Sequence, residues 1–356
     1  MLTKQLLELN SNENSLGMAD SAKQAILDSL RIGFRYPDDQ RAALISRIAK
    51  INGVIESEVS LGNGSSENIR TVVQMLLNLA FKTGKRFQVI VPDPTFAYAE
   101  LYASSLDVPV IKVPLKPESY DFDFQGLQKA ADDFDGISLF YLCNPNNPTA
   151  TITSTAPFKH WVANAPANHY FLLDEAYSEY VNDQSFESGV EWVKQQLTAN
   201  LIVVRTFSKL CALAGMRVGY AIANPSMIAA IEAFTSIDNT NLSGAVAVLA
   251  TLDDEGFLAR SLHNTNQSRQ MVEATLDELG LSYLPSQANF IFHEVNGEVK
   301  IYMDRMREYG IVVGRKFPPI EGFSRLTLGT PDEMAVFIKV LKSFRQKGWV
   351  WLSQIE

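Results

Sequence analysis

Residues 205–219 read Arg-Thr-Phe-Ser-Lys-Leu-Cys-Ala-Leu-Ala-Gly-Met-Arg-Val-Gly, and this stretch decides the fold that the sequence predicts. It directly follows the apolar run Leu201–Val204, which has the composition of a buried strand. Lys209 therefore lies just past the carboxyl end of a strand, which is a poor place for a solvated surface lysine. A lysine held there is well placed to form a Schiff base with a carbonyl cofactor.

Short apolar runs alternate with amphipathic, helix-like stretches around this segment, from about residue 60 to about residue 225. This alternation predicts an α/β fold with a mostly parallel sheet covered by helices on both faces. Ligands of such sheets bind at the carboxyl ends of the strands. The other strand candidates are Phe87–Val91, Val108–Val113, Ile137–Leu142, Tyr170–Leu173 and Val218–Ala223.

The pattern changes after about residue 225 and indicates a second, smaller α+β unit. We expect a large cofactor-binding domain over residues 31–240 and a small C-terminal domain over residues 241–356. The elements expected in the small domain are a long helix over Ser243–Gly280, strands at Ala288–Val295, Ile311–Val313 and Phe323–Leu328, and a closing helix over Pro331–Lys347.

The overall composition excludes several classes of partner. The 356 residues allow about two domains, and 31 basic against 40 acidic residues give a net charge of −9, which argues against nucleic acid or an anionic membrane as a partner. No apolar run reaches the length of a membrane span. Cys143 and Cys211 form no CxxC pair, and no basic-then-apolar leader opens the sequence, so we expect a reducing, cytoplasmic location. The four histidines lack metal-ligand spacing, so no metal is expected.

A glycine loop and the lysine segment could together bind a phosphate group. Residues 61–68, Leu-Gly-Asn-Gly-Ser-Ser-Glu-Asn, lead into an amphipathic helix, and backbone N–H groups at a helix start bind phosphate. An ordinary strand–helix turn is the alternative, whereas a dinucleotide loop would need a third glycine where Glu67 stands. The candidate side chains, each of which alone could be a cap or a surface group, are Ser65, Ser66, Glu67, Thr206, Ser208 and Arg217.

Other segments supply groups that a pyridine ring would need. Asp174 closes an apolar strand, where a carboxylate can pair with a protonated ring nitrogen; a helix N-cap is its alternative role. Tyr177 and Asn147, the latter in the rigid turn Asn-Pro-Asn-Asn-Pro-Thr, could reach a phenolic oxygen. Phe96 is the candidate for stacking on the ring, with a place in the core as the alternative.

Arg325 is the candidate for binding a substrate carboxylate. It lies within an otherwise apolar strand candidate of the second unit. Its planar guanidinium can donate two parallel hydrogen bonds to a carboxylate. A charge on an edge strand is equally compatible with the sequence.

These motifs occur in the chain order of the class I and II aminotransferases of fold type I, which use pyridoxal 5′-phosphate, and the chain most resembles the histidinol-phosphate aminotransferases among them. The resemblance implies that residues 1–30 form an arm on the small domain and that Asn14 lies at the substrate. It also implies a homodimer with shared active sites, because Tyr36 matches a tyrosine that reaches the cofactor phosphate of the partner. The segments that carry the resemblance are Asn12–Asn14, Tyr36–Asp38, Gly62–Glu67, Pro94-Thr95, Asn144–Thr149, Asp174–Tyr177, Ser208-Lys209, Arg217 and Arg325–Thr330.

Three departures from the family pattern leave the substrate open. Ser15-Leu16-Gly17 replaces Pro-Tyr-Gly, so a substrate-side tyrosine is missing. Ala150 replaces a glycine, and Gly314 stands where an arginine often binds the phosphate of histidinol phosphate. The residues that could shape the donor pocket are Arg315, Lys316, Asn239 and Asn241, although a solvated basic loop fits Arg315 and Lys316 better.

The sequence thus predicts an aminotransferase in which Lys209 carries pyridoxal phosphate and moves the substrate Cα proton. Arg325 would bind the donor, and 2-oxoglutarate is the expected amino acceptor. The same residues could serve an amino-acid-phosphate decarboxylase, or an aminotransferase for an aromatic or other amino acid. A regulatory protein of this fold would need an appended DNA-binding unit, for which the residues present and the charge leave no room.

Overall fold

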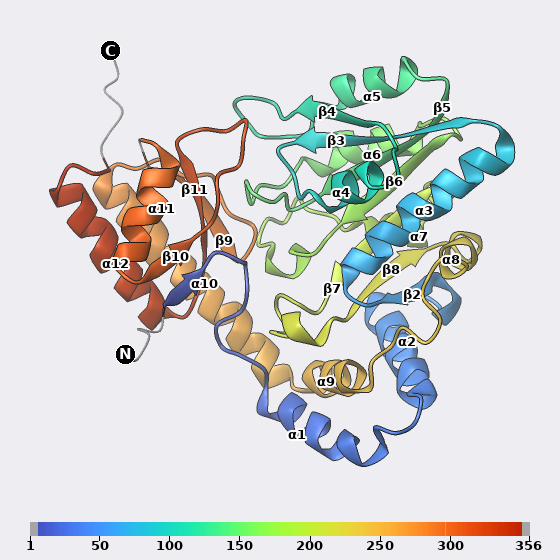
Figure 1. Ribbon diagram of the computed structural model, residues 1–356, viewed down its shortest axis with the longest axis horizontal. Helices are drawn as coiled ribbons and strands as arrows, with labels where there is room; N and C mark the ends of the chain where they lie inside the picture. Colours follow the sequence, from blue (N-terminus) through green and yellow to red (C-terminus); the bar gives the residue numbers. More distant parts are fainter. Residues whose placement is uncertain (1–5, 296, 351–356) are drawn as a thin grey trace.

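The computed structural model describes residues 6–295 and 297–350, which form two lobes (Figure 1). The larger lobe is built on a seven-stranded sheet of order β2-β8-β7-β6-β5-β3-β4. β8 runs antiparallel to both neighbours and the other neighbouring pairs are parallel, so the predicted α/β fold with a mostly parallel sheet is confirmed. The strands are β2 (Val59–Gly62), β3 (Arg86–Asp93), β4 (Val110–Pro114), β5 (Gly136–Cys143), β6 (His169–Asp174), β7 (Leu201–Thr206) and β8 (Gly219–Ala223).

Helices cover both faces of this sheet because successive strand residues point to opposite sides. Phe140 and Phe171 pack with α2, α5, α6, α7 and α9, whereas Leu139 and Leu172 pack with α3, α4 and α8. Within the described residues, none of the helices combines the length and apolar character that crossing a bilayer requires. The helices are α2 (Asp38–Asn52), α3 (Ser65–Thr83), α4 (Tyr98–Ser104), α5 (Phe124–Asp132), α6 (Thr155–Ala163), α7 (Gly189–Lys194), α8 (Pro225–Glu232) and α9 (Leu242–Asp253).

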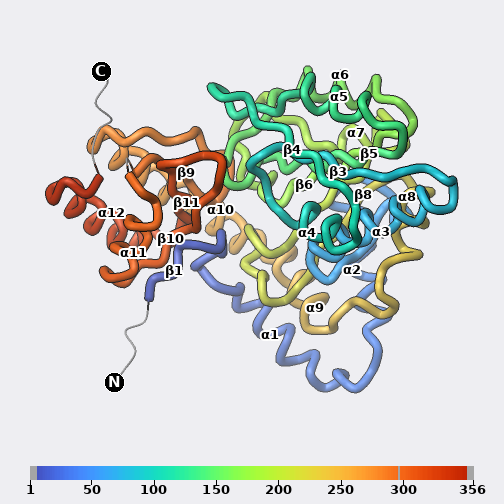
Figure 2. Tube along the Cα trace, turned by 45° about the horizontal axis from the view of Figure 1, so that its top comes forward, coloured from blue at the N-terminus to red at the C-terminus, as the bar shows by residue number. Residues whose placement is uncertain are grey.

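The smaller lobe combines two short sheets with three helices. β9 pairs antiparallel with β11, and β1 pairs parallel with β10, so the described chain begins on the smaller lobe. Figure 2 shows the segment after β1 passing from this lobe toward the larger one. The elements are β1 (Leu7–Leu9), α10 (Glu255–Leu279), β9 (Phe290–Glu294), α11 (Val299–Glu308), β10 (Ile311–Val313), β11 (Phe323–Thr327) and α12 (Pro331–Gln346).

The sequence predicts one long helix where the two lobes meet, and the structure differs there. The long helix expected over residues 243–280 is two helices, because the Asp254 carboxylate ends α9 and caps α10 by accepting a hydrogen bond from the Phe257 amide at 2.9 Å. α1 (Asp20–Ser29) and α9 both contribute to the apolar cluster of the larger lobe, through residues such as Ala22 and Val248. We therefore propose that α1 and α9 belong to the larger domain and that α10 connects the two lobes.

Candidate active site

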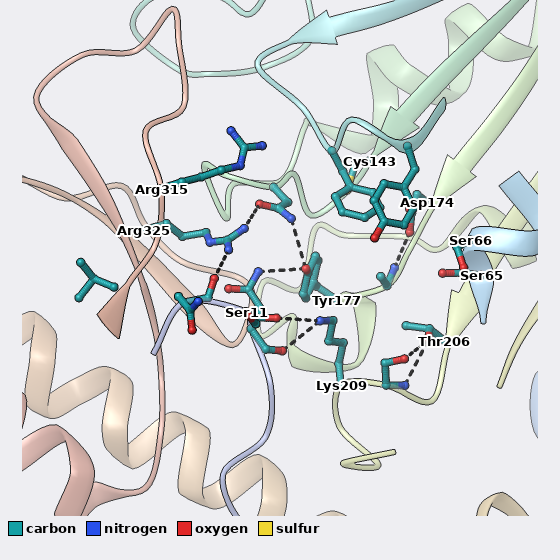
Figure 3. A pocket seen from close by; sticks show the side chains of 18 of the residues that line it. Ser11, Ser65, Ser66, Cys143, Asp174, Tyr177, Thr206, Lys209, Arg315 and Arg325 are labelled. Carbon is teal, nitrogen blue, oxygen red and sulfur yellow. Dashed lines mark hydrogen bonds between the residues drawn. The ribbon is translucent and has the colours of Figure 1, made fainter. Parts of the chain in front are cut away.

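A cleft of about 520 Å³ lies between the carboxyl ends of the parallel strands and the smaller lobe (Figure 3). The larger lobe lines it with the loops after β5, β6 and β7 and with the start of α3. Residues 10–12 line it as well, between β1 and α1. The predicted site residues that line the cleft are Ser65, Ser66, Phe96, Asn147, Asp174, Tyr177, Thr206, Ser208, Lys209, Arg217 and Arg325.

Lys209 follows β7 and extends its amine toward the chain segment after β1. Its Nζ donates hydrogen bonds to the carbonyl oxygens of Asn12 at 3.1 Å and Ser11 at 3.4 Å. Burial and, secondly, the nearby Arg325 guanidinium lower the pKa of Lys209 to about 8. A lysine with such a pKa is partly neutral near neutral pH, so it can act as a nucleophile toward an aldehyde and as a base.

Asp174 is the last residue of β6 and is almost completely buried. Its carboxylate accepts hydrogen bonds from the Tyr141 hydroxyl at 2.7 Å and from the Ala176 amide at 3.1 Å. Burial raises the pKa of Asp174 to about 6, against the lowering effect of these two neutral donors. A buried carboxyl group of this kind gains most from a cationic ligand beside it.

The start of α3 and the lysine segment form a cup of polar groups. Arg217 adopts a left-handed backbone with φ of 54° and donates a hydrogen bond from Nη2 to the Ser66 hydroxyl at 3.1 Å. Gly64, beside this guanidinium, has a φ of 77°, a backbone conformation that favours glycine at this loop position. Thr206 Oγ1 donates to Ser208 Oγ at 2.8 Å on the adjoining loop. The cup offers the donors that a phosphate needs at a helix start.

Tyr177 and Asn147 lie together in the cleft. The Tyr177 hydroxyl oxygen accepts a hydrogen bond from Asn147 Nδ2 at 3.4 Å. Phe96 lines the same cleft and packs against Tyr98, with ring centroids 4.3 Å apart. An aromatic face and two polar groups thus lie where a planar ring could bind.

Arg325 extends from β11 into the cleft, and its side chain is buried. Its guanidinium donates from Nη1 to Asn147 Oδ1 at 2.7 Å and from Nη2 to the Asn10 carbonyl at 2.5 Å. Burial lowers the pKa of Arg325 to about 10, so the group still carries its charge at neutral pH. β11 is an edge strand of its two-stranded sheet, as the alternative from the sequence supposed, but the Arg325 side chain is buried at the cleft.

Three predicted residues lie elsewhere. Glu67 is on α3, but its carboxylate accepts hydrogen bonds from the Asn63 amide at 2.6 Å and from Asn239 Nδ2 at 2.9 Å, so it braces the glycine loop from outside the cleft. The Asn14 amide donates to Ser261 Oγ at 2.6 Å and to the carbonyls of the lysine segment, also outside the cleft lining. Tyr36 is 76% exposed on the larger lobe and does not reach the cleft of its own chain.

The structure adds cleft residues that the sequence argument did not select, among them Asn10, Asn12, Tyr98, Met303 and Arg307. Met303 and Arg307 are four residues apart on α11, and this helical spacing places them on one face. Of the proposed donor-pocket residues, Arg315 lines the cleft. Lys316 pairs with Glu298, Asn239 binds Glu67, and Asn241 caps α9.

The polar groups that line the cleft match the chemical groups of pyridoxal phosphate. The cup at the start of α3 matches a phosphate, the Asp174 carboxyl group matches a protonated ring nitrogen, and the Lys209 amine matches an aldehyde. Among residues 6–295 and 297–350, no group of three or more His, Cys, Asp or Glu side chains could hold a metal ion.

Comparison with known proteins connects this site to a family. The family model for aminotransferase class I and II matches residues 4–341. Histidinol-phosphate aminotransferase 1 of Idiomarina loihiensis is 32% identical over 346 residues, which cover 96% of this chain and 90% of that protein. A solved structure from Erwinia carotovora atroseptica, provisionally assigned as a histidinol-phosphate aminotransferase, is 37% identical with a TM-score of 0.92 and covers 97% of both chains.

A second solved structure shows the same fold with the cofactor present. Histidinol-phosphate aminotransferase from Sinorhizobium meliloti, in complex with pyridoxal-5′-phosphate, superposes with a TM-score of 0.86 at 22% identity and covers 97% of this chain and 92% of that one. Fold, family match and donor chemistry agree with the prediction from the sequence. The chain therefore belongs to the class I and II aminotransferases and is a pyridoxal-phosphate-dependent transaminase.

Proposed function

We propose that this aminotransferase transfers the amino group of histidinol phosphate to 2-oxoglutarate. The observation that carries the proposal is a group of three arginines, Arg307, Arg315 and Arg325, that line one cleft. Arg315 is close enough to lower the pKa of Arg325 by charge repulsion, and such a group favours a multiply charged anion. The names of the relatives, which are histidinol-phosphate aminotransferases at 31–33% identity, support the same substrate.

The cleft residues would have separate roles in the reaction. The bound cofactor supplies an electron sink for the charge that develops when the substrate Cα proton leaves. Lys209 would take that proton with its amine and return it to the product side, because its lowered pKa suits both steps. Arg325 would bind the carboxylate of the 2-oxo acid. When the donor occupies the cleft, Arg325, Arg315 and Arg307 would together bind its phosphate.

Replacing Arg315 with alanine should weaken the use of a phosphorylated donor selectively. The Arg315 guanidinium lies 4.4 Å from the centre of the Phe317 ring and donates to the Lys316 carbonyl, which holds it in place. Loss of one charge-assisted contact should lower kcat/KM for histidinol phosphate by about 10- to 100-fold. The value for histidinol, which lacks the phosphate, should change little. Steady-state assays with both donors and 2-oxoglutarate measure the difference.

The matched control is Lys316→Ala, which removes the neighbouring cation that pairs with Glu298 outside the cleft. It should leave both donors unaffected. Equal losses for histidinol and histidinol phosphate in Arg315→Ala would contradict a phosphate-binding role. A better rate with an aromatic amino acid than with histidinol phosphate would favour the other transaminase that the sequence allowed. The decarboxylase alternative is not favoured, because the relatives are aminotransferases.

We further propose that two copies of the chain form a homodimer in which Tyr36 completes the partner's site. Apolar and aromatic side chains of the same region are uncovered in the single chain: Phe34 is 77% exposed, Leu30 63% and Leu27 60%. Such a patch on a monomer marks an interaction surface. Tyr36, at 76% exposure beside it, is free to extend across a two-fold axis.

Subunit complementation tests this arrangement. Tyr36→Ala and Lys209→Ala chains should each be impaired alone. Mixed dimers should regain one working site, because the Lys209→Ala chain supplies Tyr36 to the site that retains Lys209. Random mixing should therefore restore about one quarter of the wild-type activity. Absence of restoration in verified mixed dimers would contradict the shared site.

We also infer a cytoplasmic location. Cys143 and Cys211 are both buried as free thiols, which suits a reducing compartment. Cell fractionation with an antibody against the chain would test it.

A further inference from the structure

Every polar group of Asn12 makes a hydrogen bond, two of them to the cleft residues Lys209 and Tyr177, although the resemblance pointed to its neighbour Asn14. The residue is buried, with φ of 54° in the left-handed region that asparagine tolerates better than most residues. Its amide N–H donates to Thr327 Oγ1 at 2.9 Å, and the Thr327 hydroxyl donates back to Asn12 Oδ1 at 3.2 Å. Its carbonyl accepts from Lys209 Nζ at 3.1 Å and from Asn289 Nδ2 at 3.0 Å.

The remaining group of Asn12 acts on Tyr177. Asn12 Nδ2 donates to the Tyr177 hydroxyl oxygen at 3.0 Å, and Asn147 Nδ2 approaches the same oxygen at 3.4 Å. A phenol has one hydrogen to donate and two lone pairs to accept with. Since both amides are donors, they occupy the lone pairs, and the hydroxyl hydrogen must point elsewhere. Tyr177 lines the cleft, so the direction left to that hydrogen is the cleft itself.

The electrostatic surroundings keep this hydrogen in place. Burial raises the pKa of Tyr177 far above its ordinary value, so the hydroxyl stays protonated at any working pH. The charge of Arg325 and, after it, the Asn12 hydrogen bond lower the pKa of Tyr177 against burial, and both make the hydroxyl a stronger donor. A phenolic oxygen on the cofactor is the acceptor that such a donor would meet.

We propose that Asn12 is a positioning residue, which fixes the Tyr177 hydroxyl as a one-way donor toward the phenolic oxygen of the cofactor. The inference rests on the cofactor of the family and is independent of which amino donor the enzyme uses. Asn12 touches Tyr177 and Lys209 in this structure, and its influence on the cofactor passes through Tyr177. A purely structural role, in which Asn12 only secures the segment after β1, is the competing explanation.

Two substitutions separate these explanations in the cofactor-loaded enzyme. Asn12→Gly tolerates the left-handed backbone and keeps the contacts of the main chain to Thr327 and Lys209, but removes the amide donor. Asn12→Asp keeps the shape and the acceptor for Thr327, but offers Tyr177 a carboxylate that draws its hydrogen out of the cleft. Ser261→Ala is the structural control, because it removes the partner of Asn14 and of the Leu210 carbonyl next to Lys209, and so loosens the same region without touching Tyr177.

The readout is the pH midpoint of the visible absorption change of the lysine-bound cofactor. A donor to the phenolic oxygen competes for the proton held beside it, so weakening the donor should raise the midpoint. We expect an upward shift of about 0.5–1 pH unit in Asn12→Gly, a larger one in Asn12→Asp, and none in Ser261→Ala. Tyr177→Phe should shift the midpoint in the same direction.

Unchanged midpoints in both Asn12 variants, with circular dichroism showing native folding, would overturn the proposal. So would a shift in Ser261→Ala equal to that in Asn12→Gly, since loosening alone would then explain it. If one Asn12 variant fails to fold, the other decides. A Tyr177→Phe enzyme without any shift would also overturn it, because Tyr177 is the route by which Asn12 acts.

Discussion

Lys209→Ala protein should lose transamination by about 10⁴-fold or more, because one amine provides both the covalent attachment and the proton transfer. Among residues 6–295 and 297–350, Lys209 is the one lysine that lines the cleft; its amine is held by the Asn12 and Ser11 carbonyls, and burial together with Arg325 lowers its pKa to about 8. Alanine leaves the cup at α3 intact, so the cofactor should still bind, but without a covalent link. The measurement is single-turnover transamination, together with intact-mass analysis after borohydride reduction of the holoenzyme.

Reduction should add the mass of the cofactor to wild-type protein and leave Lys209→Ala unmodified. Lys339→Ala is the matched control, because Lys339 is exposed on α12 in the other lobe and should be silent in both assays. Cofactor mass on the Lys209→Ala chain, or turnover near the wild-type rate, would show that another amine does the work. Either result would remove the foundation of the proposed function.

The sequence predicted the site residues that are fixed by strand ends. Asp174 closes β6, and Lys209 follows β7, so the parallel sheet itself brings them to one edge. Arg217 was predicted from its distance to Lys209, although its left-handed backbone was not. For these residues the hydrophobic runs define the scaffold, and the scaffold defines the site.

Residues outside that scaffold could not be placed in the same way. The resemblance implied a site role for Asn14, but no local pattern indicated the left-handed backbone at Asn12; the Asn12 side chain binds Tyr177 and the Asn14 side chain binds Ser261. Glu67 stands in the first turn of α3, but the loop containing Asn239, far along the chain, attracts its carboxylate. Local sequence patterns carry no information about such tertiary partners.

The positions of cleft residues from the smaller lobe were also difficult to predict from the sequence. Arg315 lines the cleft and its guanidinium lies over the Phe317 ring, whereas the sequence favoured a solvated basic loop for this residue. Tyr36 cannot be placed from one chain at all, since its expected contact lies in a second copy. Substrate choice and assembly therefore depend on the parts of the sequence with the weakest local signal.

Asp174→Asn should make the cofactor-free protein more stable at pH 7.5 while weakening the enzyme. Burial raises the pKa of this carboxyl group from 3.8 to about 6, so the folded state binds its proton more tightly than the unfolded state does. Protonation of Asp174 therefore stabilises the folded state fully below about pH 4, and this contribution is lost as the pH rises through 6. Above that pH the buried group is ionised, which lowers the free energy of unfolding by up to about 3 kcal/mol. Asparagine removes this cost and can still bond to Tyr141 and the Ala176 amide.

Urea unfolding of the cofactor-free proteins should show the variant more stable by roughly 1–3 kcal/mol at pH 7.5, with the difference vanishing near pH 4. Cofactor affinity should fall and kcat should drop by about 10²- to 10³-fold, because a neutral amide no longer holds the ring nitrogen protonated. Asp132→Asn, on the exposed end of α5, should alter neither stability nor activity appreciably. Equal stability of wild type and Asp174→Asn across this pH range would contradict a strained carboxylate. A stabilised variant with undiminished kcat would mean that the Asp174 charge does not act on the ring nitrogen of the cofactor. Asp174 would then contribute to packing alone.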